Sequence, residues 1–169
     1  MPEKTTLERA RKDKQAGKSP STQAGEFVRE EMDHIREGKH GARSTKQAIA
    51  IGLSKARRAG VHLGRPPASA RPRTKQSAAS ASRAGRHPRR RPSARRSRAT
   101  LAALKKENRR AASRKSLARQ ARSAARRRSA ASRSRAAQRA VRTKGARGRK
   151  AAARRAARTR QRRRASSAA

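Results

Sequence analysis

Apolar residues recur at helical spacing between about residues 22 and 37. They are separated by one, three or four positions, so they share one face of a helix. The stripe consists of Ala24, Phe27, Val28, Met32 and Ile35. Acidic residues flank it, and we expect them on the helix surface: Glu26, Glu30, Glu31 and Asp33. Gly38 and Gly41 end the pattern, so a turn is predicted there.

A second stripe predicts a helix from about 45 to 59. It consists of Ala48, Ile49, Gly52, Leu53 and Ala56. Ser44 and Gln47 have capping-box spacing at its start. At its end, Gly60 and Val61 predict a Schellman motif. Gly52 in mid-helix costs about 1 kcal/mol relative to Ala, which indicates close packing against the first stripe. The two stripes therefore predict a helical hairpin.

A weaker pattern precedes the hairpin and predicts a short helix over residues 5–16. Thr5 and Glu8 have capping-box spacing, and Gly17 is a helix stop. Together the three helices form a predicted module over residues 1–65 whose core contains about ten side chains. Because so small a core is marginal alone, we expect the hairpin to form a homodimer or bind a protein partner.

Beyond residue 65 the apolar pattern fades. The remaining large apolar residues are Leu101, Leu104, Leu117 and Val141. Five prolines within residues 66–97 predict an extended basic linker over 66–99. Residues 100–169 are rich in Ala and Arg, with Thr100 as a plausible N-cap and an interruption around Gly145. Like charges at adjacent and i,i+4 positions oppose the high helix propensity of Ala and Arg. The predicted fold is therefore mostly α with extensive disorder, with a tail that becomes helical on binding.

Charge divides the chain in the same way. Its 169 residues include 52 Lys or Arg and 9 Asp or Glu, for a net charge of +43. Residues 1–65 carry a net charge of +7, and residues 66–169 carry +36. A solvated protein face does not account for such a density, so the tail is predicted to bind a polyanion. Arg outnumbers Lys by 39 to 13, and guanidinium groups bind phosphate bidentately.

The predicted nucleic-acid contacts are the tail arginines, with no single one decisive. They are Arg65, Arg71, Arg73, Arg89, Arg90, Arg91, Arg95, Arg96, Arg109, Arg110, Arg126, Arg127, Arg128, Arg154, Arg155, Arg162, Arg163 and Arg164. Two alternatives, in which the protein recognises particular DNA sequences, stay open. The hairpin could be a helix–turn–helix reader, and Gly64-Arg65-Pro66 resembles the core of an AT-hook, although Leu63 replaces the Arg that usually precedes the Gly.

Catalytic and cofactor chemistry is not indicated. The chain has no Cys, which excludes disulfides and thiolate metal sites. The four His residues, His34, His40, His62 and His87, lack metal-ligand spacing, and we expect them to be solvated. No nucleophile elbow or phosphate-binding loop is present, so we predict no enzyme activity, metal or cofactor. No apolar run is long enough to span a membrane, and the polar N-terminus lacks a signal sequence, so a cytoplasmic location is expected.

Two resemblances accompany this reading. Residues 66–169 resemble the Ala-, Lys- and Arg-rich C-terminal domains of bacterial histone H1-like proteins, although those are usually dominated by Lys. The stretch KHGARSTKQAIAIGLSKAR looks like part of a small bacterial helical domain of unknown function. The resemblance to histone H1-like proteins implies a nucleoid-associated protein that binds and compacts DNA without sequence specificity, whereas the N-terminal resemblance brings no established activity. Two alternatives remain, an RNA- or ribosome-associated protein and an interaction protein that acts through the hairpin.

Overall fold

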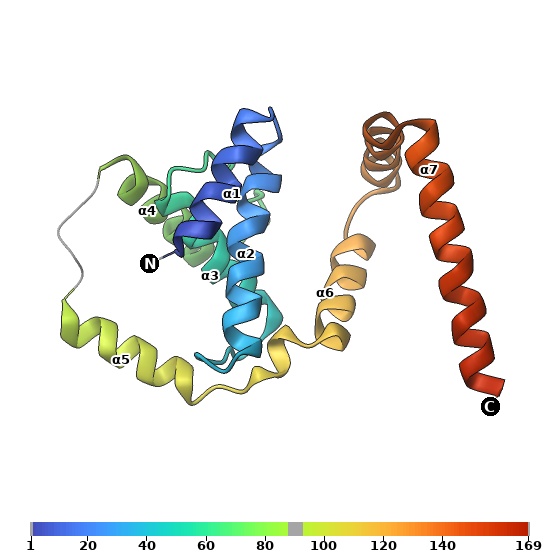
Figure 1. Ribbon diagram of the computed structural model, residues 1–169. Helices are drawn as coiled ribbons and strands as arrows, with labels where there is room; N and C mark the ends of the chain where they lie inside the picture. Colours follow the sequence, from blue (N-terminus) through green and yellow to red (C-terminus); the bar gives the residue numbers. More distant parts are fainter. Residues whose placement is uncertain (1, 88–92, 169) are drawn as a thin grey trace. The chain divides into compact units, whose positions relative to one another are not determined.

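The structure is a computed structural model that describes residues 2–87 and 93–168, and every regular element among these residues is a helix (Figure 1). The side chains of residues 143, 144, 163, 167 and 168 are not described. The elements are α1 (Lys4–Gln15), α2 (Pro20–Arg36), α3 (Thr45–Arg58), α4 (Pro72–Arg86), α5 (Ala94–Lys105), the 3₁₀-helix η1 (Arg109–Ala112), α6 (Arg114–Arg126) and α7 (Ala130–Ala168). By its contacts the chain divides into two compact units, residues 1–120 and 121–169.

The prediction of extensive disorder after residue 65 is wrong, because helices make up 77% of the chain. Residues 66–99 are not one extended linker, since α4 and the first half of α5 lie there. Pro72 occupies the first turn of α4, where a missing N–H is harmless. Pro88 and Pro92 lie outside the described residues. The helix propensity of Ala and Arg outweighs the repulsion between neighbouring cations along the rest of the tail.

The tail helices also begin at other residues than predicted. Thr100 does not cap a helix, because it lies inside α5 and its hydroxyl donates to the carbonyl oxygen of Arg96 at 2.9 Å. Ser93 is the cap instead, and its Oγ accepts from the Arg96 N–H. The interruption predicted around Gly145 is confirmed, since this residue (φ 61°, ψ 179°) kinks α7.

Among the first three helices, α3 has both of its predicted caps, whereas α1 and α2 begin without a side-chain cap. The Schellman motif at Gly60 is confirmed by bonds from Gly60 N to Arg57 O (3.1 Å) and from Val61 N to Ala56 O (3.0 Å). Ser44 Oγ accepts from Gln47 N, as the capping box requires. The capping box at Thr5 is wrong, because α1 begins one residue earlier, after Glu3, without a side-chain cap.

Helices α2 and α3 form a hairpin, and α1 packs against α2 (Figure 1). The predicted close approach at Gly52 is confirmed, because a Cβ there would lie 2.8 Å from the Cα of Val28. One buried cluster joins the three helices around the fully buried Phe27. Its members are Ala10, Ala24, Phe27 and Ala56, with Leu7, Leu53, Val61 and Leu63 packed against them.

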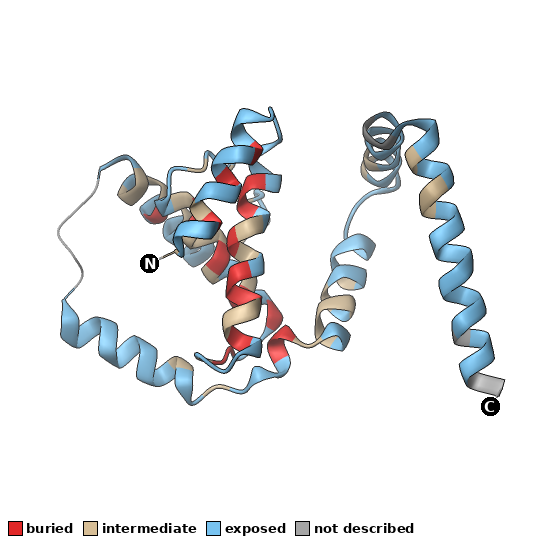
Figure 2. Ribbon diagram, viewed as in Figure 1, coloured by how far each residue is buried: buried red, intermediate tan, exposed pale blue. Residues whose placement is uncertain are grey.

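A second buried cluster contains two residues, Ala111 and Ala112, that the charge pattern assigns to the basic tail. Met32, Ile35, Ala42, Ala48, Ala111 and Ala112 form it. The Thr45 hydroxyl donates to Ala111 O at 2.7 Å, and Gly41 N donates to Leu104 O at 2.9 Å. A side chain at Gly41 would meet the backbone of Glu107. The segment from Leu104 to Ala112 therefore completes the hairpin core (Figure 2).

The second unit has no comparable core. None of its described side chains is buried, and α7 is exposed along nearly its whole length (Figure 2). Among the described residues, no helix is both long enough and apolar enough to span a membrane.

Candidate nucleic-acid interface

The predicted phosphate contacts are exposed wherever the structure describes them. The exposed side chains are Arg65, Arg71, Arg73, Arg95, Arg96, Arg109, Arg110, Arg126, Arg127, Arg128, Arg154, Arg155, Arg162 and Arg164. Arg89, Arg90 and Arg91 lie outside the described residues, and the side chain of Arg163 is not described. The set is divided between the two units: the arginines up to Arg110 belong to the first, and those from Arg126 onward to the second.

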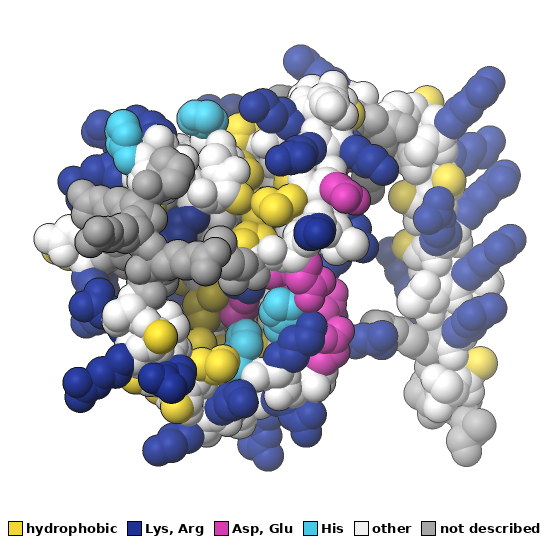
Figure 3. Space-filling view, turned by 60° about the vertical axis from the view of Figure 1, so that its left-hand side comes forward, with side chains coloured by type: hydrophobic (Ala, Val, Ile, Leu, Met, Phe, Trp, Pro, Cys, Tyr) yellow, Lys and Arg dark blue, Asp and Glu magenta, His cyan; other side chains and the backbone are white. Residues whose placement is uncertain are grey.

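The half of α7 after Gly145 presents cations in a regular array. Arg147, Lys150, Arg154 and Arg158 follow one another at three- and four-residue spacing, so they share one face, and we call these four the α7 ridge. Figure 3 shows a column of Lys and Arg side chains at the right of the view. Residues 121–169 contain 19 Lys or Arg and no acidic residue. Nothing in this stretch of sequence therefore offsets the charge of the ridge.

The dimensions of this half-helix matter for duplex binding. Its 23 residues from 146 to 168 span about 34 Å at 1.5 Å per residue. Ala fills most positions between the cations, and Gly148, Thr159 and Gln161 fill the others, so no aromatic or large aliphatic side chain widens it. An α-helix about 10–12 Å across matches a B-DNA major groove about 12 Å wide. The half-helix is as long as about one turn of duplex.

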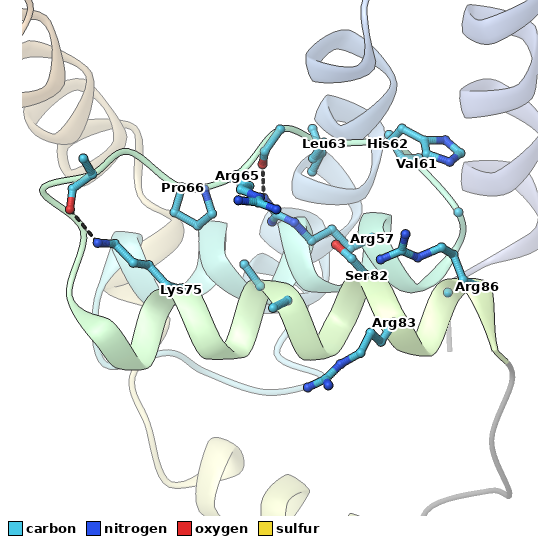
Figure 4. Close-up of a pocket in the computed structure, with 16 residues that line it drawn as sticks. Arg57, Val61, His62, Leu63, Arg65, Pro66, Lys75, Ser82, Arg83 and Arg86 are labelled. Atoms are coloured by element: carbon cyan, nitrogen blue, oxygen red, sulfur yellow. Dashed lines mark hydrogen bonds between the residues drawn. The ribbon is translucent and has the colours of Figure 1, made fainter.

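A groove of about 1030 Å³ lies in the first unit between α4, the end of α3 and the loop of residues 60–68 (Figure 4). Two cations hold the loop in place. Arg57 Nη2 donates to Gly64 O at 3.0 Å, and Lys75 Nζ donates to Ala68 O at 2.6 Å. The tripeptide Gly64-Arg65-Pro66 thus lines this groove, with Arg65 exposed.

Three further cations line the groove, Lys75, Arg83 and Arg86, and the sequence pattern does not single them out. They lie on α4, which was not predicted, because its packing face consists of Ala and Gly. Gly85 is part of that face, and a side chain there would meet the carbonyl oxygen of Arg57. A face of such small residues gives no hydrophobic periodicity that distinguishes it from the rest of an Ala-rich sequence.

Glu30 and Glu31 are buried, contrary to the expectation that they lie on the helix surface. Lys55 of α3 lies between them, with Nζ 3.0 Å from Glu30 Oε1 and 2.8 Å from Glu31 Oε2. Burial by itself would raise the pKa of Glu30, but hydrogen bonds from Lys55, from the backbone of Glu3 and from Thr6 bring that pKa below its ordinary value. Burial opposes the charge of Lys55 as well, yet the two carboxylates raise its pKa.

His34 and His40 are not solvated, whereas His62 and His87 are exposed as expected. Only 14% of the His34 side chain and 10% of the His40 side chain are accessible. His34 Nε2 lies 2.8 Å from Glu3 Oε1, and His40 Nε2 lies 3.4 Å from Glu31 Oε1. The bonds from His34 and then from Lys39 lower the pKa of Glu3. Acidic and His side chains lie side by side on the face shown in Figure 3.

The comparisons with known proteins concern the hairpin and not the cationic helices. A family model described as a family of unknown function (DUF6496) matches residues 11–66, about a third of the chain. Residues 11–66 include the hairpin, with Glu30, Glu31, His34, His40 and Lys55, and end before α4. No curated protein and no solved structure matches this chain. Over these residues the chain is similar to that family, and the similarity brings no activity with it.

Proposed function

We propose that the protein binds duplex DNA without sequence specificity and compacts it in the nucleoid. The observation that carries the proposal is the exposed array of cations on α7, in a unit whose sequence contains no acidic residue. Binding of each cation to a phosphate releases condensed counterions, which drives association at low salt. If about 20 phosphates are neutralised, log K falls against log salt with a slope of about −18.

The geometry of α7 favours B-form DNA over duplex RNA. Its narrow half-helix fits a major groove about 12 Å wide, whereas the major groove of A-form RNA is too narrow and deep for side chains to enter. With Phe27 as its single aromatic residue, and that one buried, the chain also lacks stacking platforms for single strands.

The first unit would stay folded by itself while the cationic helices bind DNA. The apolar faces of α2 and α3 are covered by α1 and by residues 104–112 of the same chain. Among the described residues, Leu101 and Val141 are the large apolar side chains classed as exposed. Self-association through the hairpin stays a prediction, and the RNA alternative becomes an outcome of the test below.

The test is a charge-matched comparison in the full chain. One variant replaces the α7 ridge with Gln, and a control replaces four exposed cations of α1 (Lys4, Arg11, Lys12 and Lys14) with Gln. Affinity for a random-sequence DNA duplex is measured across a salt series. We expect the ridge variant to lose about 3.6 from the magnitude of the salt slope, at about 0.9 per phosphate contact, and the control to keep nearly the wild-type slope.

Equal slopes for the two variants would show that net charge alone matters and that α7 is not the interface. Competition with duplex RNA of the same length separates the alternatives. DNA should outcompete RNA, and the reverse result would replace the proposal with an RNA-binding function. Compaction is measured on long DNA molecules, where the ridge variant should need a higher protein concentration than the control.

A further inference from the structure

We propose that Glu31, His34 and His40 bind one Zn²⁺ ion in the first unit. The proposal is independent of nucleic-acid binding, since its residues belong to the hairpin and not to the cationic helices. One potential ligand atom from each residue lies within 4.8 Å of those of the other two. Two imidazoles and one carboxylate are donors that zinc prefers.

Local structure explains why these three residues meet. Glu31 and His34 are three positions apart on α2, so they share a face of the helix. Gly38 (φ 81°) then ends α2 in a Schellman motif, with Lys39 N donating to His34 O at 3.0 Å and Gly38 N to Ile35 O at 3.2 Å. This turn returns His40 to the same face. The rings of His34 and His40 meet edge to face, with centroids 6.2 Å apart.

The hydrogen bonds of His40 leave one ring nitrogen ready for a metal. Its Nδ1 lies 3.0 Å from the carbonyl oxygen of Gly41, which can only accept, so Nδ1 carries the proton. In the neutral ring Nε2 therefore presents its lone pair. A bond from the distal nitrogen to a backbone carbonyl is the usual way in which proteins orient a ligating imidazole.

That lone pair faces a carboxylate oxygen, and the two acceptors repel unless a proton or a metal ion lies between them. Glu31 is completely buried, and its Oε1 accepts no hydrogen bond from any residue the structure describes. The 3.4 Å from Oε1 to His40 Nε2 is long for an N–H···O bond. It equals the edge of a tetrahedral zinc site, about 3.3–3.6 Å for bonds of about 2.0–2.2 Å.

The surrounding charges are compatible with a divalent ion despite the basic chain. Lys55 binds the other oxygen of Glu31, Oε2, and therefore leaves Oε1 to the metal. A solvent molecule would take the fourth position, because Glu3 Oε1 lies 2.8 Å from His34 Nε2, which is a hydrogen-bond distance and is shorter than the edge of a tetrahedral zinc site. A bound ion would link α2 to the turn that follows it. Its binding free energy would stabilise a unit whose hydrophobic core is small.

The test uses the tag-free, chelator-treated full chain and Zn²⁺ alone. Calorimetry should give one site per chain, and Co²⁺ in its place should give the intense absorption of a tetrahedral complex. His40→Ala and His34→Ala should each weaken Zn²⁺ binding by more than about 100-fold, because losing even an outer-shell partner of a metal ligand costs about 10- to 100-fold. His62→Ala makes the same change at an exposed His and should bind as the wild type does.

Circular dichroism confirms that each variant is folded before titration. The proposal is overturned if the wild type shows no saturable site at micromolar Zn²⁺, or if His40→Ala and His34→Ala bind as tightly as His62→Ala. A weakly absorbing, octahedral Co²⁺ complex also overturns it. None of these outcomes depends on whether the protein binds DNA.

Discussion

Gly52 and Lys55 lie one turn apart on α3, and both contact α2. The glycine lets the two backbones approach, and the lysine neutralises two carboxylates that this approach buries. The sequence alone predicts the role of Gly52, because a glycine inside a helix has a cost that needs a reason. It does not predict the role of Lys55, because a lysine near a helix C-terminus has an adequate explanation in the helix dipole.

Replacement of Gly52 tests the close approach. Gly52→Ala gains about 1 kcal/mol of helix propensity, but its Cβ would lie 2.8 Å from Val28 Cα, and overpacking costs about 1–3 kcal/mol. We expect a net loss in the free energy of unfolding, measured by urea denaturation. Gly25→Ala on α2 is the control, since nothing lies within 4 Å of its Cβ position, and it should stabilise the protein. A stabilised Gly52→Ala variant would contradict the packing.

Removal of the Lys55 charge tests the buried ion pairs. Lys55→Met should lower the free energy of unfolding by about 3–5 kcal/mol, since it removes the cation that the buried Glu30 and Glu31 share. Lys46→Met, at an exposed position of the same helix, should change it by less than about 0.5 kcal/mol. Similar values for the two variants would show that the ion pairs contribute nothing.

The same cluster sets a pH dependence. The pKa of Glu30 is lower in the folded state than its ordinary value of 4.5, so its contribution to stability is complete above pH 4.5 and is lost as the pH falls through the folded pKa. Lys55 has a raised pKa, so its contribution is complete below pH 10.5 and is lost above it. The midpoint of thermal unfolding should fall at low pH and again at high pH. Lys55→Met should make the decrease at high pH smaller.

At the scale of elements, the predictable helices are those with large apolar residues at regular spacing. Phe27, Met32 and Ile35 mark α2 clearly, and their burial follows from the pattern. Helix α4 and the first half of α5 were missed because the prolines of residues 66–97 suggested an extended linker. Ala81, the one buried residue of α4, is no different in the sequence from the alanines around it. The Glu31–His34–His40 cluster was missed because it depends on a turn geometry and not on spacing alone.

The kink of α7 gives a prediction for an element. Gly145 adopts φ 61° and ψ 179°, a conformation that is essentially confined to glycine. Gly145→Ala should therefore make α7 one continuous helix. The native chain has no Cys, so spin labels at Ser132→Cys and Thr159→Cys can report the distance, which should approach about 40 Å in a straight helix. The same distance with and without the Ala substitution would contradict this.

The whole chain divides by its contacts after Gln120, not after residue 65, where the charge and apolar patterns place the boundary. The reason lies in the packing of α4 against α3 and in three small contributions from the segment that follows. Ala111 and Ala112 are buried in the hairpin core, and Leu117 packs against it. Such contacts connect residues about 70 positions apart and leave no mark in the local pattern. The separation of large apolar residues from the cationic helices was, by contrast, evident in the sequence.

Two truncations distinguish these boundaries. A chain ending at Gln120 keeps both buried clusters, so we expect its unfolding midpoint to match that of the first unit in the full chain. A chain ending at Ser97 loses Ala111, Ala112 and Leu117, and its midpoint should fall clearly. Calorimetry makes the comparison, and equal midpoints would contradict the boundary. On the proposed function, the chain ending at Gln120 should also fail to compact DNA, although it remains folded.

The close backbone approaches at Gly41, Gly52 and Gly85 also bear on how the molecule tolerates inherited change. At these positions a larger side chain would meet backbone atoms that cannot easily move aside. An exposed arginine of the array, by contrast, is one of many equivalent charges, and its loss is shared among the rest. Tolerance of mutation is therefore uneven along the chain. The exposed arginines, although chemically conspicuous, are individually dispensable, and selection should act most severely on the three inconspicuous glycines.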